Sequence, residues 1–374
     1  MRFVRFDLER WQSTWENRVR FNLSESGVHP LRVGELLALA GAEPDPLLDV
    51  RLGYSQSNGT APLRERIAAL YPGASPDQVL VTTGSAEANY IAALRLVEPG
   101  DAVAMLLPNY LQLWGHVQNL GALVRGVMLH ERHGWAPDPD EIRAAIAPGT
   151  KLVVVTNPHN PTGHILTEPA RRVILERTAE VGAWLLADEV YTGAERDGRT
   201  TLSFWGSYDR LICVSGLSKA YGLPGLRIGW LVGPPDFVAE CWARHDYTTI
   251  GPSGTTDYLA SIALQPAVRE RLLARTCAIL RENFPVLEDW LRTFGDTFSW
   301  VPPQAGAICF VRYRDGIDGE TLVERVRAEQ SVLLVPGEHF GTPGYLRFGY
   351  GNESAELHQA LAAAAAGLRH AFGA

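Results

Sequence analysis

The sequence lacks the features that mark membrane-spanning, secreted and nucleic-acid-binding proteins. No stretch reaches the ~18 consecutive apolar residues of a membrane-spanning helix. The first 15 residues carry acidic residues and tryptophans and have no apolar core of signal-peptide length. Acidic residues outnumber basic ones, 42 to 34, and the net charge of -8 argues against nucleic acid as a general partner. No internal repeat and no low-complexity linker occurs.

Cysteine is also scarce. The four cysteines, Cys213, Cys241, Cys277 and Cys309, lie far apart and form no CxxC pair. Three of them lie in apolar runs, which is typical of buried, reduced thiols in a cytoplasmic protein. We therefore expect a soluble cytoplasmic protein that binds neither a membrane nor a nucleic acid, and we expect no metal site.

Short apolar runs alternate with helical segments between residues 78 and 232. Runs this apolar are typical of strands that are buried on both faces of a mainly parallel sheet. Ligands bind to such sheets at the carboxyl ends of the strands. The predicted strands are Val79–Thr83, Ala102–Leu107, Leu123–Leu129, Leu152–Thr156, Trp184–Ala187, Leu211–Val214 and Ile228–Val232.

The pattern of apolar and polar residues along the sequence predicts three regions. Residues 1–45 mix aromatic and polar residues and are expected to form an N-terminal arm that packs on the small domain. Residues 46–265 are expected to form the large domain. Residues 266–374 are expected to form a smaller α+β domain. It comprises a long helix over Val268–Phe294, a helix over Glu320–Gln330, and strands over Gly306–Tyr313, Val332–Val335 and Tyr345–Phe348.

Lys219 lies in the stretch SGLSKAYGLPGLRIGW (215–230), just after a predicted strand. A partly desolvated lysine amine shifts toward its neutral form and can form a Schiff base with an aldehyde. Arg227, eight residues later, offers a planar, permanently charged fork to a phosphate. An SK dipeptide alone more often marks a surface loop, so the interpretation depends on the motifs that accompany it.

Three other motifs follow predicted strands. Gly84-Ser85-Ala86 stands at a strand-to-helix junction, where backbone N–H groups suit a phosphate or simply begin the helix. In the loop NPHNPTG (157–163), two prolines and a glycine fix the direction of an Asn amide. Asp188, in DEVY, ends an apolar strand. Because an unpaired buried charge is costly, it needs a cationic partner such as a pyridinium nitrogen.

Arg347 interrupts the apolar stretch YLRFGYG. Arginine is rarely buried without an anion. Its partner is therefore expected to be either the carboxylate of a ligand or a structural carboxylate.

In order and spacing, NPHNPTG, DEVY and SGLSKAYGLPGLRIGW resemble the fold-type I pyridoxal-phosphate enzymes of the aminotransferase class I/II family. The resemblance extends from about Gly53 to the C-terminus. It implies an α/β fold with a large domain on a mainly parallel seven-stranded sheet and a smaller α+β domain. It also implies pyridoxal 5'-phosphate (PLP) as cofactor and a small amino acid as substrate.

The same resemblance implies roles for the motif residues. Lys219 would hold the cofactor and carry the substrate proton, and Asp188 would pair with the pyridine nitrogen. With Tyr191 they are the catalytic candidates. Arg347, with Asn160, would bind the substrate, Arg347 at its α-carboxylate. The other cofactor contacts would be Asn160 and Tyr191 at the phenolic oxygen, Tyr110 on the ring, and Gly84, Ser85, Ala86, Ser218 and Arg227 at the phosphate.

Tyr54 matches a tyrosine that reaches the phosphate of the neighbouring subunit in this family. The match implies a homodimer with shared active sites. Gly216 departs from the family pattern, because many members have Ser or Thr there for the phosphate.

The reaction type stays open. The segments SESGVHP, GELLALA, GSAEANY and VLLVPGEHFG are more similar to those of capreomycidine synthases, which act by elimination and cyclisation on a hydroxylated arginine, than to those of aspartate aminotransferases. The unaltered DEVY is the ordinary aminotransferase form. An aminotransferase acting on an L-amino acid is the first interpretation. The alternative is a β/γ-elimination, replacement or cyclisation enzyme of natural-product biosynthesis. Both begin by removing the α-proton of a substrate that is bound to the cofactor as a Schiff base.

A third hypothesis is a regulator that uses this fold as a sensor. It is weak, because residues 1–50 show no winged-helix pattern and the net charge is negative. Side-chain specificity follows from no motif. The residues expected to set it lie in the arm (Trp11, Trp15, Glu25 and His29) and in the stretch His245–Gly254.

Overall fold

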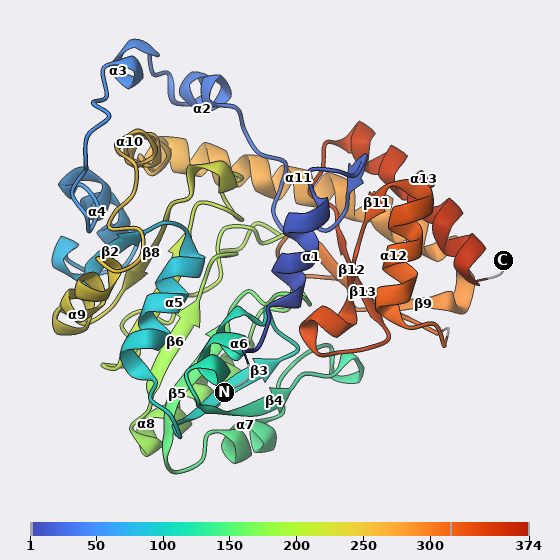
Figure 1. The fold of residues 1–374 in the computed structure, drawn as a ribbon, viewed down its shortest axis with the longest axis horizontal. Coiled ribbons are helices and arrows are strands. Elements are labelled where there is room, and N and C mark those ends of the chain that lie inside the picture. The colour runs from blue at the N-terminus through green and yellow to red at the C-terminus, as the bar shows by residue number, and fades with distance from the viewer. Residues whose placement is uncertain (1–2, 315, 373–374) are drawn as a thin grey trace.

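A seven-stranded sheet forms the centre of the larger part of the chain (Figure 1). The computed structural model describes residues 3–314 and 316–372. The strand order is β2 (Val79–Thr82), β8 (Gly229–Val232), β7 (Leu211–Gly216), β6 (Trp184–Asp188), β5 (Thr150–Thr156), β3 (Ala102–Leu107) and β4 (Leu123–Met128). Only β8 runs antiparallel to its neighbours, β2 and β7. The predicted mainly parallel sheet is therefore confirmed.

Alternate residues of these strands face two separate hydrophobic clusters. In β2, Leu80 belongs to one cluster and Val79 and Val81 belong to the other. Helices α5 (Ser85–Leu96), α6 (Gln112–Asn119) and α9 (Pro235–His245) contribute side chains to the first cluster. The second cluster receives α4 (Ala61–Ala68), α7 (Pro139–Ala145), α8 (Glu168–Val181) and α10 (Gly254–Ala263). Burial on both faces explains why the strands read as continuous apolar runs.

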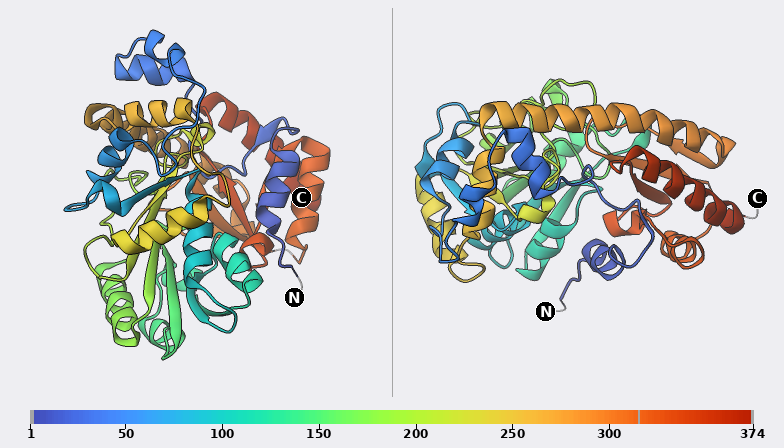
Figure 2. Two further views of the ribbon diagram at one scale, coloured as in Figure 1. Left: turned by 60° about the vertical axis from the view of Figure 1, so that its left-hand side comes forward. Right: turned by 90° about the horizontal axis from the view of Figure 1, so that it is seen from above.

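The smaller part contains a four-stranded antiparallel sheet. Its order is β12 (Val335–Pro336), β13 (Tyr345–Gly349), β10 (Ile308–Tyr313) and β9 (Phe298–Trp300). Helix α11 (Pro266–Arg292) runs from the larger part into the smaller one (Figure 2). The smaller part also contains helices α12 (Gly319–Gln330) and α13 (Ser354–Phe372). The run Val332–Val335 is not one strand, because the chain changes partners at Leu334 and β11 (Val332–Leu333) pairs elsewhere.

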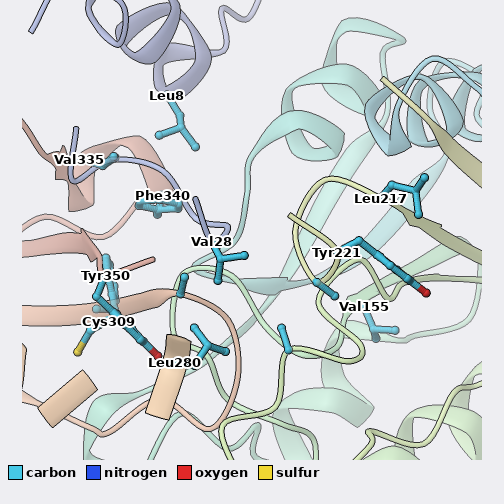
Figure 3. Packing of buried hydrophobic residues seen from close by; sticks show 14 of the residues in the cluster. Leu8, Val28, Val155, Leu217, Tyr221, Leu280, Cys309, Val335, Phe340 and Tyr350 are labelled. Atoms are coloured by element: carbon cyan, nitrogen blue, oxygen red, sulfur yellow. The ribbon is translucent and has the colours of Figure 1, made fainter. Parts of the chain in front are cut away.

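The N-terminal segment joins the two parts. Strand β1 (Phe21–Asn22) pairs in parallel with β11. Helix α1 (Asp7–Trp15) places Leu8 in the same hydrophobic cluster as Val335 and Phe340 (Figure 3). Further on, α2 (Val33–Ala40) and α3 (Asp45–Leu48) stand out from the body of the chain (Figure 2).

The four cysteines are unpaired, and Cys213, Cys241 and Cys309 are buried. Among the described residues, no helix combines the length and the apolar character that crossing a membrane requires.

Candidate active site

A cavity of about 460 Å³ opens where the carboxyl ends of β5, β6 and β7 meet the N-terminal segment. Ten of the twelve predicted site residues line it: Ser85, Ala86, Tyr110, Asn160, Asp188, Tyr191, Ser218, Lys219, Arg227 and Arg347. Gly84 lies directly beside it, at the start of α5. Tyr54 is 97% exposed, does not line this cavity, and forms a β-bridge with Ser253.

At one end of the cavity, the first turn of α5 lies against Arg227. Gly84 has a φ of +83°, which side-chain-bearing residues rarely adopt, and a Cβ there would come within 2.5 Å of Nη2 of Arg227. A Cβ at Gly216 would lie 3.0 Å from the Ile228 carbonyl oxygen and 3.2 Å from Cα of Gly229. Gly216 is therefore tightly packed against β8, which gives a physical reason for the missing Ser or Thr.

Asp188 ends β6 inside the cavity and is buried. Its Oδ2 accepts a hydrogen bond from the Asn89 amide at 3.0 Å, and its Oδ1 accepts one from the Val190 backbone N–H at 3.2 Å. Burial raises the pKa of Asp188. Among the described residues, the side-chain partner of the Asp188 carboxylate is therefore the neutral amide of Asn89 and not a cationic side chain. Sequence reasoning missed Asn89, although it lies four residues after Ser85 and so shares its face of α5.

Lys219 follows β7, and its Nζ donates to Oε1 of Glu25 at 2.7 Å. Burial alone would raise the pKa of Glu25, but the Lys219 ammonium and the backbone N–H groups of Ser26 and Gly27 lower it to about 2. Burial tends to lower the pKa of Lys219, but the negative charge of Glu25 more than offsets this and raises it. Desolvation thus acts on this amine in the expected direction, and the carboxylate beside it opposes that effect.

Arg347 is 1% exposed and stands over the ring of Phe340 at 5.0 Å. Its Nη1 donates to Asn160 Oδ1 at 2.9 Å, and its Nη2 donates to the Ser24 carbonyl oxygen at 2.5 Å. The buried Nε has no partner. Within the described part of the chain, no carboxylate forms a salt bridge with this guanidinium. Its environment therefore fits a cation that still needs an anion.

The wall formed by the N-terminal segment carries three carboxylates, which we call the arm carboxylates: Glu9, Glu16 and Glu25. Oε1 of Glu9 accepts a hydrogen bond from the Tyr110 hydroxyl at 2.6 Å. Burial and the negative charges of Glu25 and Glu9 raise the pKa of Glu16. Three like charges on one wall repel each other unless a cation joins them. Sequence reasoning named Glu25 but missed Glu9 and Glu16, for which no motif gave a signal.

The other residues expected to set specificity lie outside the cavity lining. Trp11 donates to the Leu334 carbonyl, Trp15 packs under Arg327, and His29 contacts Arg275. The stretch His245–Gly254 instead surrounds Glu87, which receives hydrogen bonds from the side chains of Thr248 and Thr249.

These residues fit PLP on the evidence of the structure itself. The glycine-lined start of α5 with Arg227 suits a phosphate, since helix N-termini bind anions. A buried carboxylate at Asp188 suits a protonated ring nitrogen, and the Lys219 amine suits an aldehyde.

Comparison with known proteins places the chain among PLP enzymes. The family model for aminotransferase class I and II matches residues 34–363. Capreomycidine synthase of Streptomyces vinaceus is 36% identical over 363 residues, covering 95% of this chain and 92% of that protein. A PLP-dependent aminotransferase from Streptococcus suis has a TM-score of 0.91 at 33% identity, covering 99% of both chains. The PLP-dependent cyclase OrfR also has a TM-score of 0.91, at 28% identity, covering 99% of this chain and 98% of the other. The chain belongs to the aminotransferase class I and II family, whose cofactor is PLP.

Proposed function

We propose that this protein is a PLP-dependent enzyme that acts on an L-amino acid with a positively charged side chain, such as a guanidinium. The observation that carries this proposal is the charge inventory of the cavity. Its cations are Lys219, Arg227 and Arg347, and its carboxylates are Asp188 and the three arm carboxylates. Once the cofactor and the α-carboxylate have taken the three cations and Asp188, the charged groups that remain in the cavity lining are all carboxylates, and these would meet the substrate side chain.

The cofactor would be held by the residues at the strand ends. Arg227 and the backbone around Gly84, Ser85 and Ala86 would bind the phosphate, with Ser218 beside them. Asn89 aligns Asp188, so that its carboxylate would face the ring nitrogen. When bound, the cofactor supplies an electron sink for the electrons left at Cα.

Tyr110, Asn160 and Tyr191 would contact the ring of the cofactor. The hydroxyl of Tyr110 is already held by Glu9, which leaves its ring as the contact surface. Asn160 Oδ1 is held by Arg347, so its amide nitrogen would face the ligand.

The substrate would be bound at both ends. Arg347 would bind the α-carboxylate, because it lines the cavity and a carboxylate matches its planar, charged guanidinium. Glu16 would bind the cationic side chain. It lines the cavity, and a nearby cation would relieve its repulsion by Glu25 and Glu9.

Transamination is the reaction that we propose first. It needs one group that carries a proton between the substrate Cα and the cofactor, and Lys219, which lines the cavity, would be that group. Tyr191 is buried in the unaltered DEVY segment, which is the ordinary aminotransferase form. Similarity to an aminotransferase at 33% identity over 99% of the chain supports this reaction.

Elimination followed by ring closure is the second candidate. Its support is the similarity to capreomycidine synthase over 95% of the chain and to the cyclase OrfR. The leaving hydroxyl departs as water, and Lys219 would supply the proton for it after taking the proton from Cα.

The active unit is proposed to be a homodimer. Leu48, Leu52, Tyr54 and Tyr247 are large apolar or aromatic side chains that are 79–97% exposed, and the first three lie in or after the projecting segment α2–α3. Three large, highly exposed apolar side chains within seven residues support a contact with another subunit at this segment. In the dimer, Tyr54 would reach the phosphate of the partner. Sedimentation of the cofactor-loaded protein tests this, and a stable, fully loaded monomer would contradict it.

The substrate proposal is tested with two matched pairs of amino acids. Citrulline has nearly the shape of arginine without its charge, and norleucine likewise replaces lysine. We expect wild type to bind the cationic member of each pair at least about tenfold more tightly, as charge-assisted bonds of ~1.5–3 kcal/mol require. Glu16→Gln should reduce that ratio. Equal binding of both members would contradict the proposal.

Mass spectrometry of the products separates the two reactions. Transamination of arginine yields a keto acid and leaves the amino group on the cofactor. A β-hydroxylated arginine that instead loses water and closes a ring identifies elimination and cyclisation.

A further inference from the structure

We propose that Glu25 is the counter-ion of Lys219 and that it sets the protonation state of the lysine that carries the cofactor. Oε1 of Glu25 lies 2.7 Å from Nζ of Lys219, although the two residues are 194 positions apart in the sequence. The proposal relies on the proposed function only for the role of Lys219. It links a residue of the N-terminal segment to the lysine that follows β7.

The structure holds the Glu25 carboxylate firmly in this place. Its Oε1 also accepts the backbone N–H groups of Ser26 at 2.8 Å and Gly27 at 2.9 Å. The backbone around Glu25 packs closely against two other segments. A Cβ at Gly27 would lie 3.2 Å from the carbonyl oxygen of Ser218, and a Cβ at Gly349 would lie 2.1 Å from the carbonyl oxygen of Glu25. A carboxylate fixed in this way keeps its distance to the lysine without losing side-chain entropy.

Other charged and titratable groups also face Lys219. Glu16 lies at the end of α1, Tyr191 follows β6, and Arg347 lies in β13. Arg347 acts against protonation, whereas Tyr191 favours it. Among the described residues, Glu25 is the only carboxylate in salt-bridge contact with the amine. The protonation state of Lys219 therefore depends mainly on Glu25.

The consequence is chemical. Only a neutral amine condenses with an aldehyde, forming a C=N bond and releasing water, so an ammonium must first lose its proton to solvent. Glu25 lowers the neutral fraction of Lys219 in the cofactor-free protein. The same carboxylate favours a positive charge on the Lys219 nitrogen in every form in which that nitrogen stays beside it.

The chain offers a direct test, because its only lysines are Lys219 and Lys151. Lys151 is exposed in β5 and serves as an internal reference. We would label the cofactor-free, full-length protein with acetic anhydride over a range of pH and quantify both lysines by peptide mapping. Since an adjacent opposite charge shifts a pKa by 1–3 units, Glu25→Gln should raise labelling of Lys219 relative to Lys151 at least about tenfold at pH 8.

Glu16→Gln is the matched control, because it removes a carboxylate of the same wall that makes no bond to Lys219, and we expect less than a threefold change. Glu25→Asp keeps the charge and should retain most of the protection. A Glu25→Gln protein that is folded by circular dichroism but shows a wild-type labelling ratio would overturn the proposal.

If Glu25→Gln does not fold, the wild-type protein alone decides. A labelling midpoint of Lys219 at or below that of Lys151 would overturn the proposal, and a higher midpoint supports it. In the loaded enzyme, the pH at which the cofactor absorbance changes should fall in Glu25→Gln. None of these readouts depends on which amino acid the enzyme uses, so the proposal can fail while the proposed function holds, and the reverse.

Discussion

The two halves of the cavity are built in different ways. The cofactor half consists of Ser85, Ala86, Asp188, Ser218, Lys219 and Arg227, and each of these residues lies at a strand end, at a helix start or in a loop that borders a strand. The arm half consists of Phe6, Glu9, Gln12, Glu16 and Glu25, from a segment that reaches the cavity only by packing on other elements. In the cofactor half, the strand or helix that carries a residue also places its side chain at the cavity. In the arm half, packing of the N-terminal segment on other elements places the side chains there.

The two halves would serve different purposes: the cofactor half the chemistry common to PLP enzymes, and the arm half the recognition of a particular substrate. In the proposed function, the cofactor half would supply what a PLP enzyme needs, namely an amine, an anion site and a carboxylate for the ring. The arm half adds negative charge that the cofactor does not require. The two halves meet at the bond between Lys219 and Glu25.

Lys219→Ala should have the largest effect, because it removes the one group in the cofactor half that can bind the cofactor covalently. We expect complete loss of the absorbance of the bound cofactor and of activity, with an unchanged fold by circular dichroism. Borohydride reduction of the wild type followed by peptide mapping checks the assignment. Lys151→Ala is the control and should behave as wild type; finding the cofactor on Lys151 would refute the assignment.

Arg347→Lys should have the next largest effect, and it sharpens the comparison because Arg347 lies between the two halves. A point charge cannot reproduce a planar fork, and charge-assisted bonds are worth ~1.5–3 kcal/mol each. Amino-acid affinity should therefore fall at least about tenfold, while the cofactor spectrum stays unchanged. Amines without a carboxylate should bind almost as before. Equal weakening of both ligand classes together with a lower melting temperature would identify a structural role instead.

Glu87→Gln should have the smallest effect, and it tests whether the cofactor half is rigid. Burial alone would raise the pKa of Glu87, but hydrogen bonds from His245, Thr248 and the Thr83 backbone N–H lower it to about 2. Because the folded-state pKa is depressed, this stabilisation is present above the ordinary value near 4.5 and is lost as the pH falls toward 2.

The melting temperature of Glu87→Gln should therefore be lower by about 2–4 °C at pH 7, and the difference from wild type should shrink as the pH falls from 5 to 2. Differential scanning calorimetry measures both. Glu65→Gln, an exposed position in α4, is the control. A difference that stays constant across this pH range would show that the ionised form of Glu87 does not contribute.

By itself, the sequence determined the sheet and the cofactor half. Strands buried on both faces must be apolar throughout, so β3 could be placed to the residue and the other six strands of this sheet to within two residues. The motifs DEVY and SGLSKAYGLPGLRIGW follow these strands in an order that resembles the aminotransferase class I/II family, which is why Asp188, Lys219 and Arg227 could be predicted together. Periodicity also placed α11, because a long amphipathic helix needs no distant partner to be recognised.

Only the tertiary structure decided the partners of these residues. The pairing of Glu25 with Lys219, of Tyr110 with Glu9 and of Asp188 with Asn89 joins segments 99 to 194 positions apart. The tertiary structure also divides the apolar run Val332–Val335 into two strands, of which β11 pairs with β1 and β12 pairs with β13. Local propensity carries no information on such contacts, because side-chain charge and hydrogen bonding depend on which chain segments packing brings within about 3 Å. The protonation state of Lys219 depends on the same packing, because a neighbouring carboxylate acts on its pKa in the opposite direction to burial.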